Sequence, residues 1–179
     1  MAFDINEIKS QLQFDGARQN LFMVQFLNPA NSIADIKAPF LITASELPES
    51  HLGTIQVPYF GRMIKLAGDR SYQPWPITVI NDEDFLIKNA MEDWSAKINS
   101  PEGNTRRLAK YKSQARITQL SKSGKALRTY IFHGIWPETV SEIGMSWSDN
   151  DNIETFRVTF QYDYWTVEPG VTGNAGGTR

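Results

Sequence analysis

The feature that most constrains the fold is a strict alternation of side chains from Thr155 to Trp165. Apolar residues stand at every second position and polar residues stand between them; the apolar set is Phe156, Val158, Phe160, Tyr162 and Tyr164. Successive side chains of a β-strand point to opposite faces, so this pattern predicts a strand with one face in a core. Its eleven residues, at about 3.3 Å each, predict a single strand of roughly 35 Å, which is longer than usual.

Runs of similar character predict further strands along the chain. They cover 21–27, 39–43, 54–59, 62–66, 76–80, 115–120 and 127–133, followed by a short strand through Val140 and Ile143. Pro58-Tyr59-Phe60-Gly61 predicts a hairpin tip or a sharp bend, and Lys122-Ser123-Gly124-Lys125 predicts a second hairpin turn. Within 54–59, Ile55, Val57 and Tyr59 fall on one face of the strand.

One helix interrupts these strands. Asn81 or Asp82 can cap its N-terminus, and Pro101 and Gly103 prevent its continuation. Apolar residues recur between them at helical spacing, at Ile87, Met91, Trp94 and Ile98. Such a stripe is typical of core packing, so we expect the helix to cover one face of a sheet.

These elements predict a mainly β chain with an α+β composition. We expect two packed antiparallel sheets, or a flattened β-barrel, with one flanking α-helix. Residues 1–165 are predicted to form a single β domain. Residues 166–179 are rich in glycine and are predicted to form a flexible C-terminal tail.

The sequence offers little that is typical of catalysis. It contains no cysteine, and neither of its histidines, His51 and His133, lies in a recognisable catalytic or zinc motif. Asp149-Asn150-Asp151-Asn152 resembles the start of a calcium loop, but Glu154 stands where that loop needs glycine. We therefore expect a protein that is not an enzyme and that uses no metal or cofactor.

The chain also lacks the pattern of a secreted or membrane-spanning protein. No basic segment followed by an apolar run begins it, and no apolar stretch approaches the roughly 18 residues of a membrane helix. We expect no membrane segment, and synthesis and retention in a cytoplasm.

Charge is strongly segregated although the formal net charge is only -2. Residues 106–128 contain eight basic and no acidic residues, whereas residues 138–168 contain seven acidic residues and one basic residue. Opposite charges can serve contacts between two copies of a chain. The candidates for such contacts are Arg106, Arg107, Lys110, Lys112, Asp149 and Asp151. Two alternatives stay open, namely solvated faces without a partner and a DNA-binding module, although Tyr111 alone could stack on bases in the basic stretch.

Three blocks of sequence resemble phage tail tube proteins in order and spacing from about residue 16 to residue 165. The first block is Gly16-Ala17-Arg18-Gln19-Asn20-Leu21-Phe22. The second comprises Leu66-Ala67-Gly68-Asp69-Arg70, Trp75, Val79-Ile80-Asn81-Asp82-Glu83 and Asp93-Trp94. The third comprises Gly134-Ile135-Trp136-Pro137, Ser146-Trp147, Ile153-Glu154-Thr155-Phe156 and Asp163-Tyr164-Trp165.

This resemblance implies a structural subunit of a contractile phage tail. Its copies would form hexameric rings that stack into a hollow tube, with tail sheath protein outside, a baseplate at one end and a tape-measure protein inside during assembly. DNA would later pass through the lumen without specific binding. The protein would be a virion component assembled in the host cytoplasm. Related roles are a baseplate ring that initiates the tube and the inner tube of a type VI secretion or other injection system.

The resemblance also implies a site. In the family, a hairpin after the second strand reaches toward the adjacent ring, and here it falls near residues 49–62. Tyr59, Phe60 and Arg62 are therefore the candidates for the contact between rings. The alternative is that both aromatic rings fold inward.

Overall fold

The structure is a computed structural model that describes residues 5–12, 16–30, 32–104 and 111–168. The described residues form three helices and nine strands. Their order is α1 (Ile5–Gln11), β1 (Phe22–Phe26), α2 (Ile33–Leu41), β2 (Ile42–Ser45), β3 (His51–Tyr59), β4 (Arg62–Ser71), β5 (Trp75–Ile80), α3 (Leu86–Ile98), β6 (Ser113–Leu120), β7 (Ala126–Val140), β8 (Thr155–Gln161) and β9 (Tyr164–Val167). None of these helices is long and apolar enough to cross a membrane.

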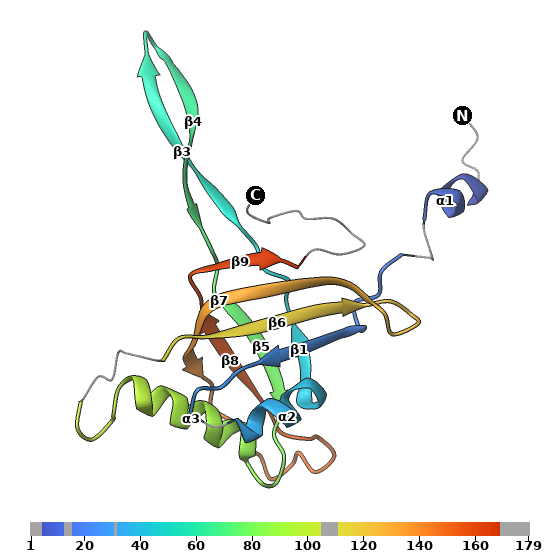
Figure 1. Ribbon diagram of the computed structural model, residues 1–179, viewed down its shortest axis with the longest axis vertical. Coiled ribbons are helices and arrows are strands. Elements are labelled where there is room, and N and C mark those ends of the chain that lie inside the picture. The colour runs from blue at the N-terminus through green and yellow to red at the C-terminus, as the bar shows by residue number, and fades with distance from the viewer. Residues whose placement is uncertain (1–4, 13–15, 31, 105–110, 169–179) are drawn as a thin grey trace.

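Seven strands make one sheet that bends into two layers (Figure 1). Its strand order is β1-β6-β7-β8-β5-β2, with β9 also paired to β7, and every pairing is antiparallel. The first part of β7 pairs with β6 and β9, and its last part, from Trp136, pairs with β8. The predicted pair of packed antiparallel sheets is therefore confirmed, with β7 shared between them. The path through the described strands stays open between β1 and β2, so it is not a closed barrel.

The core lies between the two layers and is dominated by aromatic rings. Trp75 stacks on Phe132 with ring centroids 4.2 Å apart, and it also contacts Phe160 at 5.7 Å. The helix α3 closes the core by burying Ile87, Ala90, Met91 and Trp94. The indole Nε1 of Trp94 donates a hydrogen bond to the backbone oxygen of Tyr111 at 2.7 Å. The predicted covering helix is confirmed, because its apolar stripe is buried in this core.

The prediction of one long strand from Thr155 to Trp165 is wrong. The strand is interrupted by a bend at Tyr162 and Asp163, where the backbone N–H of Asp163 donates to the oxygen of His133 at 2.9 Å. β8 therefore ends at Gln161, and β9 continues in the same direction along the first part of β7. The alternating pattern continues across this bend, which is why it looks like one unbroken strand in the sequence.

The long strand of the molecule is instead β7, with 15 residues. It includes Val140, for which a separate short strand was predicted, and ends before Ile143. The strand β9 includes Thr166 and Val167, the first two residues of the predicted tail. Residues 169–179 lie outside the described part of the chain.

The predicted strand over 39–43 is also wrong in its first three residues, because α2 continues to Leu41. Ala34 and Ala38 stand four positions apart on this helix and are fully buried, so they let it pack closely against the core. Pro39 lies inside the helix, in its last turn. β2 begins only at Ile42.

The single flanking helix of the prediction is likewise wrong in number, since α1 and α2 accompany α3. α3 also begins later than the predicted caps, with Phe85 at its N-cap in a left-handed conformation. Asn81 is instead buried, and its side-chain amide donates to Glu154 at 2.9 Å. Asp84, and not Asn81 or Asp82, accepts the backbone N–H of Leu86 at the start of the helix.

Candidate assembly interface

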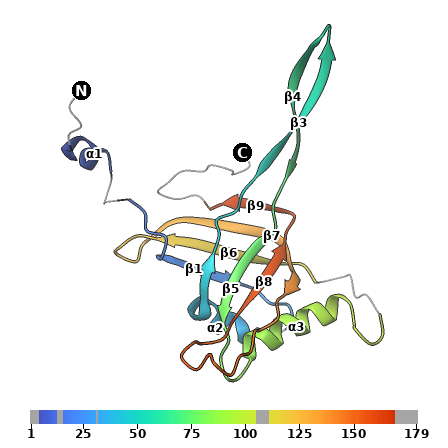
Figure 2. The same cartoon turned by 180° about the vertical axis from the view of Figure 1, so that it is seen from behind.

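The strands β3 and β4 form a hairpin that projects well beyond the two layers (Figures 1 and 2). They pair only with each other in the described structure, from His51↔Ser71 to Tyr59↔Arg62. Nearly all of their residues are exposed, with Gly53 and Gly68 the exceptions. An isolated two-stranded ribbon is only marginally stable in water, so this projection needs another surface to stabilise it.

The two faces of the hairpin differ in chemistry. Antiparallel register places directly paired residues on the same face, and the pairs Ile55↔Leu66, Val57↔Ile64 and Tyr59↔Arg62 make one face. We call this the apolar face; four of its six side chains are aliphatic and all six are exposed. The opposite face, here the polar face, carries Gln56↔Lys65 and Thr54↔Ala67, with Pro58↔Met63 near its end. The predicted alignment of Ile55, Val57 and Tyr59 on one face is confirmed.

The tip of the hairpin is a two-residue turn made by Phe60 and Gly61. Both have positive φ angles, 42° and 80°, as a type I′ turn requires. The ring of Phe60 is 94% exposed and lies edge-on to the ring of Tyr59, with centroids 4.8 Å apart. Tyr59, Phe60 and Arg62 thus lie together at the most distant point of the molecule, exposed and not folded inward.

A β-bulge interrupts the regular pairing of β3 and β4 near the base of the hairpin. The register slips between Leu52 and Thr54, so that Gly53 faces both Gly68 and Asp69 on the opposite strand. A Cβ at Gly68 would lie 3.2 Å from the backbone of Gly53, and a Cβ at Gly53 would lie 3.2 Å from the oxygen of Asp69. Two glycines therefore permit a close crossing of the strands, where extra twist is expected.

A second exposed apolar surface lies at the opposite end of the body, on and beside α2. Ile36 and Phe40 project from this helix four residues apart and are 73% and 83% exposed. Leu27, just after β1, is also exposed. A pocket of about 370 Å³ opens between β1, β6 and α2. Ile36 and Phe40 were not predicted as a surface, because Phe40 falls in a run that predicts a strand; the four-residue spacing of Ala34 and Ala38 is the signal that would have indicated a helix.

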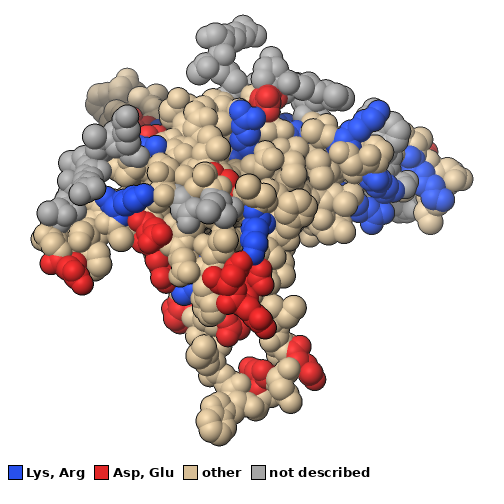
Figure 3. All heavy atoms as spheres, turned by 60° about the horizontal axis from the view of Figure 1, so that its bottom comes forward, with Lys and Arg blue, Asp and Glu red and all other residues tan. Residues whose placement is uncertain are grey.

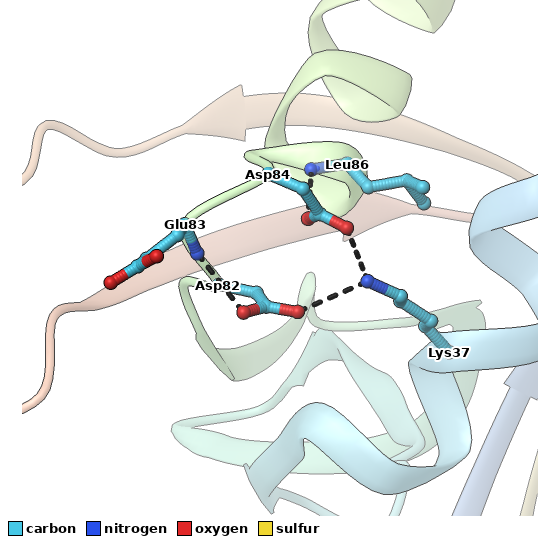
Figure 4. Close-up of polar contacts among 5 residues, drawn as sticks. All are labelled: Lys37, Asp82, Glu83, Asp84 and Leu86. Carbon is cyan, nitrogen blue, oxygen red and sulfur yellow. Dashed lines mark hydrogen bonds and ion pairs between the residues drawn. The ribbon is translucent and has the colours of Figure 1, made fainter.

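Charges around this end are mainly acidic. Lys37 of α2 forms ion pairs with Asp82, at 3.0 Å, and with Asp84 (Figure 4). The two carboxylates lie in the connection before α3, and the hydrogen bonds from Lys37 lower the pKa of Asp84 and raise that of Lys37. Glu83 lies beside them and points away from the lysine (Figure 4). Two carboxylates thus contact one ammonium group, and a third lies beside them without contacting it.

The connection between β7 and β8 extends this acidic end. It carries Asp149 and Asp151, both exposed, and Trp147, whose side chain is fully exposed. Figure 3 shows acidic side chains gathered on the face at this end and basic side chains gathered to one side of it. We define the acidic end by Asp82, Glu83, Asp84, Asp149 and Asp151.

The remaining charge candidates fall in two groups. Arg106, Arg107 and Lys110 lie outside the described residues. Lys112 is described, and its Nζ lies 2.6 Å from the Oδ1 of Asp163 in the same chain. The basic and acidic segments therefore already meet inside one copy at this position, and the pKa of Lys112 is raised by its hydrogen bond to Asp163.

The two histidines lie apart and have different surroundings. His133 stacks on Tyr164 at 4.6 Å, and its Nε2 lies 2.9 Å from the hydroxyl of Thr166. Burial lowers the pKa of His133, which favours the neutral ring. His51 is exposed at the start of β3. Over the described ranges, no three acidic or histidine side chains gather in a way that would hold a metal ion.

Comparison with known proteins places this architecture in a family. The chain is 34% identical to the tail tube protein gp19 of Enterobacteria phage T4 over 155 residues, which is 84% of this chain and 91% of that protein. It is 26% identical to the tail tube protein of Serratia phage KSP90, covering 88% of this chain and 93% of that protein.

Solved structures of similar fold come from contractile injection systems. The tube-terminating cap of the anti-feeding prophage superposes with a TM-score of 0.66 at 19% identity, over 95% of this chain and all of that one. A chain of the PVC sheath–tube complex in its extended state gives 0.57 at 16% identity, over 93% and 99%. These two likenesses concern the fold. The sequence also matches the family described as phage tail tube protein over residues 13–168. This chain therefore belongs to the phage tail tube protein family, whose members are structural proteins of the tail.

Proposed function

We propose that copies of this chain form hexameric rings that stack head to tail into the hollow tube of a contractile phage tail, through which DNA passes to the host. The observation that carries this proposal is the projecting hairpin. Its apolar face exposes Ile55, Val57, Ile64 and Leu66 in the single chain. Such a face is stabilised when another surface removes it from water, at roughly 25 cal/mol per Å² of apolar area.

The arrangement of surfaces supports stacking in one direction. The hairpin and α2 lie at opposite ends of the molecule (Figures 1 and 2), so a contact between them joins different surfaces of two copies. Contacts of this heterologous kind close into rings or continue into filaments. Membership of the family supports the other partners of the proposal: a tail sheath protein outside, a baseplate at one end and a tape-measure protein in the lumen. The protein would then be part of the virion after assembly in the host cytoplasm.

Negative-stain electron microscopy of the purified protein, alone and seeded with baseplates, tests the proposal. We expect hollow tubes of many stacked rings. A single terminal ring would instead indicate the tube initiator of the baseplate, and particles that remain dispersed at high concentration, even with seeds, contradict the proposal. Duplex binding that weakens steeply with salt would favour the DNA-binding module.

Two substitutions on neighbouring positions of β3 test the hairpin itself. Val57→Lys places a charge on the apolar face, and Gln56→Lys places the same charge on the polar face. We expect Val57→Lys to raise the critical concentration for tube formation at least tenfold, because a lysine there must be buried or must keep the surfaces apart. Gln56→Lys should change it little. If the two variants change the critical concentration equally, assembly does not depend on the apolar face.

A further inference from the structure

We propose that the pocket between β1, β6 and α2 receives Phe60 and Arg62 from the hairpin tip of the next copy. This inference rests on the proposed function and adds to it the acceptor site for the hairpin. It commits to one occupant, a second copy of this chain.

The pocket has walls suited to an aromatic ring. Its volume is about 370 Å³, and it is lined by Phe26, Leu27, Gln25, Gln114, Arg116 and Asp35 among others. β1 and β6 hold these residues in register, with Gln25 opposite Arg116. The N–H of Leu27 donates to the oxygen of Gln114 at 3.0 Å, which continues the pairing past the end of β1. The pocket is therefore formed by two paired strands and the start of a helix.

The charges in the pocket match both parts of the tip. Asp35 projects from α2 into the wall, where its carboxylate accepts the backbone N–H of Asn28 at 3.0 Å. In the described part of the chain, no basic side chain pairs with it. Burial raises the pKa of Asp35, so an arriving guanidinium would stabilise its charged form. Arg116 supplies a cation that can lie against the face of an aromatic ring.

The hairpin tip carries groups that complement the charges in the pocket, and it carries no acidic side chain. From Thr54 to Gly68 the hairpin carries Arg62 and Lys65 but no carboxylate. It points away from the body (Figure 1), whose other end carries the acidic side chains shown in Figure 3. Phe60 holds a left-handed conformation that L-residues with large side chains rarely adopt. Among the described residues its ring contacts one aromatic ring, that of Tyr59, and is otherwise 94% exposed, so a partner surface best accounts for an aromatic residue at this position.

Location excludes the same contact within one chain. The hairpin tip projects away from β1, β6 and α2 (Figures 1 and 2), and these elements line the pocket, so one copy cannot fill its own pocket. Each copy in a stack would insert its tip into the next and receive the tip of the previous one. The contact repeats without limit, as a tube requires.

Disulfide cross-linking tests the acceptor site, because the natural chain contains no cysteine. A chain carrying Phe60→Cys and Leu27→Cys should give a ladder of covalent multimers when assembled tubes are oxidised, and neither single variant should give more than dimers. The matched control joins Phe60→Cys with Ser123→Cys, at the far end of β6 from the pocket. We expect no ladder from it.

A second measurement avoids substitution at the contact. Hydroxyl-radical labelling of the unmodified protein should fall several-fold at both Phe60 and Leu27 when dispersed protein assembles into tubes. Two results would contradict the acceptor site without contradicting the proposed function. In the first, tubes form while the labelling of Leu27 stays unchanged; in the second, tubes form and only the variant with Phe60→Cys and Ser123→Cys cross-links. A wild-type protein that forms no tubes would overturn the proposed function itself.

Discussion

Gly134 stands where β7 passes from one layer of the sheet to the other. Its φ angle is 70°, and the register between β6 and β7 slips at this residue. A Cβ added here would collide with the carboxylate of Asp163, the residue at which the chain bends between β8 and β9. One glycine thus permits both the bend of β7 and the approach of Asp163 against it.

The first prediction concerns this glycine. Gly134→Ala should lower the free energy of unfolding by about 3 kcal/mol, because the left-handed angle and the collision with Asp163 both oppose it. Gly124→Ala is the matched control, since Gly124 also has a positive φ but open space around its Cβ position. It should cost about 1 kcal/mol. Denaturant unfolding of the dispersed protein measures both, and equal losses would show that the contact with Asp163 does not matter.

The second prediction concerns Tyr162. Its hydroxyl is buried without a hydrogen-bond partner among the described residues, and burial is the main cause that raises its pKa to about 12. Because the folded state holds the phenol proton more tightly than the unfolded state, stability should fall as pH rises above about 10 and level off near 12. Tyr162→Phe should remove this part of the alkaline loss, and at pH 7 it should leave stability unchanged or raise it by up to about 1 kcal/mol.

Thermal unfolding between pH 8 and pH 11.5 checks the Tyr162 prediction. Tyr164→Phe serves as the control, because Tyr164 is about half exposed on β9. If both variants keep the full alkaline loss of the wild type, the buried hydroxyl is not its source.

At the scale of elements, the sequence predicts strands well where alternation is local. The strands that became β1 and β3 to β6, together with both hairpin turns, are found close to the expected positions. The apolar face of the hairpin was also predictable, because a period of two places Ile55, Val57 and Tyr59 together whatever surrounds them. The tip candidates needed the family resemblance as well, since alternation alone does not say that a hairpin projects.

The failures come from interactions between distant parts of the chain. The bend after Gln161 places the backbone N–H of Asp163 against the oxygen of His133, and a periodicity cannot report that partner. The continuation of β7 through Pro137 depends on its change of partner from β6 to β8. For Pro39, a local preference against helix was overridden by the burial of Ala34 and Ala38. The pocket was not predictable, because it joins β1, α2 and β6.

The third prediction concerns the turn at the tip of the hairpin. Phe60→Asn creates the Asn-Gly pair that type I′ turns favour, so the hairpin should become more stable in the dispersed protein, by about 1 kcal/mol. Assembly should become weaker, because the variant loses the exposed ring. Amide hydrogen exchange across β3 and β4 measures the first effect, and the critical concentration for tube formation measures the second. If the variant assembles as well as the wild type, Phe60 does not take part in the contact between copies.

At the scale of the whole molecule, the two ends differ in charge as well as in shape. The hairpin from Thr54 to Gly68 carries only basic charges, and the acidic end carries five carboxylates, two of which pair with Lys37. A nearly neutral net charge of -2 conceals this polarity. Copies aligned head to tail bring opposite charges together, whereas copies aligned head to head bring like charges together. The charge pattern therefore favours one direction of stacking.

The last prediction uses the acidic connection between β7 and β8. Asp149→Lys combined with Asp151→Lys should raise the critical concentration for assembly roughly tenfold at low salt, which corresponds to about 1.4 kcal/mol per contact. The effect should shrink as the salt concentration approaches 1 M, where charges separated by more than about 3 Å are screened. Asp149→Asn with Asp151→Asn, which removes the charges without reversing them, should give a smaller effect.

If the basic segment is the partner, adding Arg106→Glu and Arg107→Glu to the reversed variant should restore assembly, because the attraction is rebuilt with exchanged signs. A reversed variant that assembles normally at every salt concentration would mean that these aspartates face only solvent in the tube.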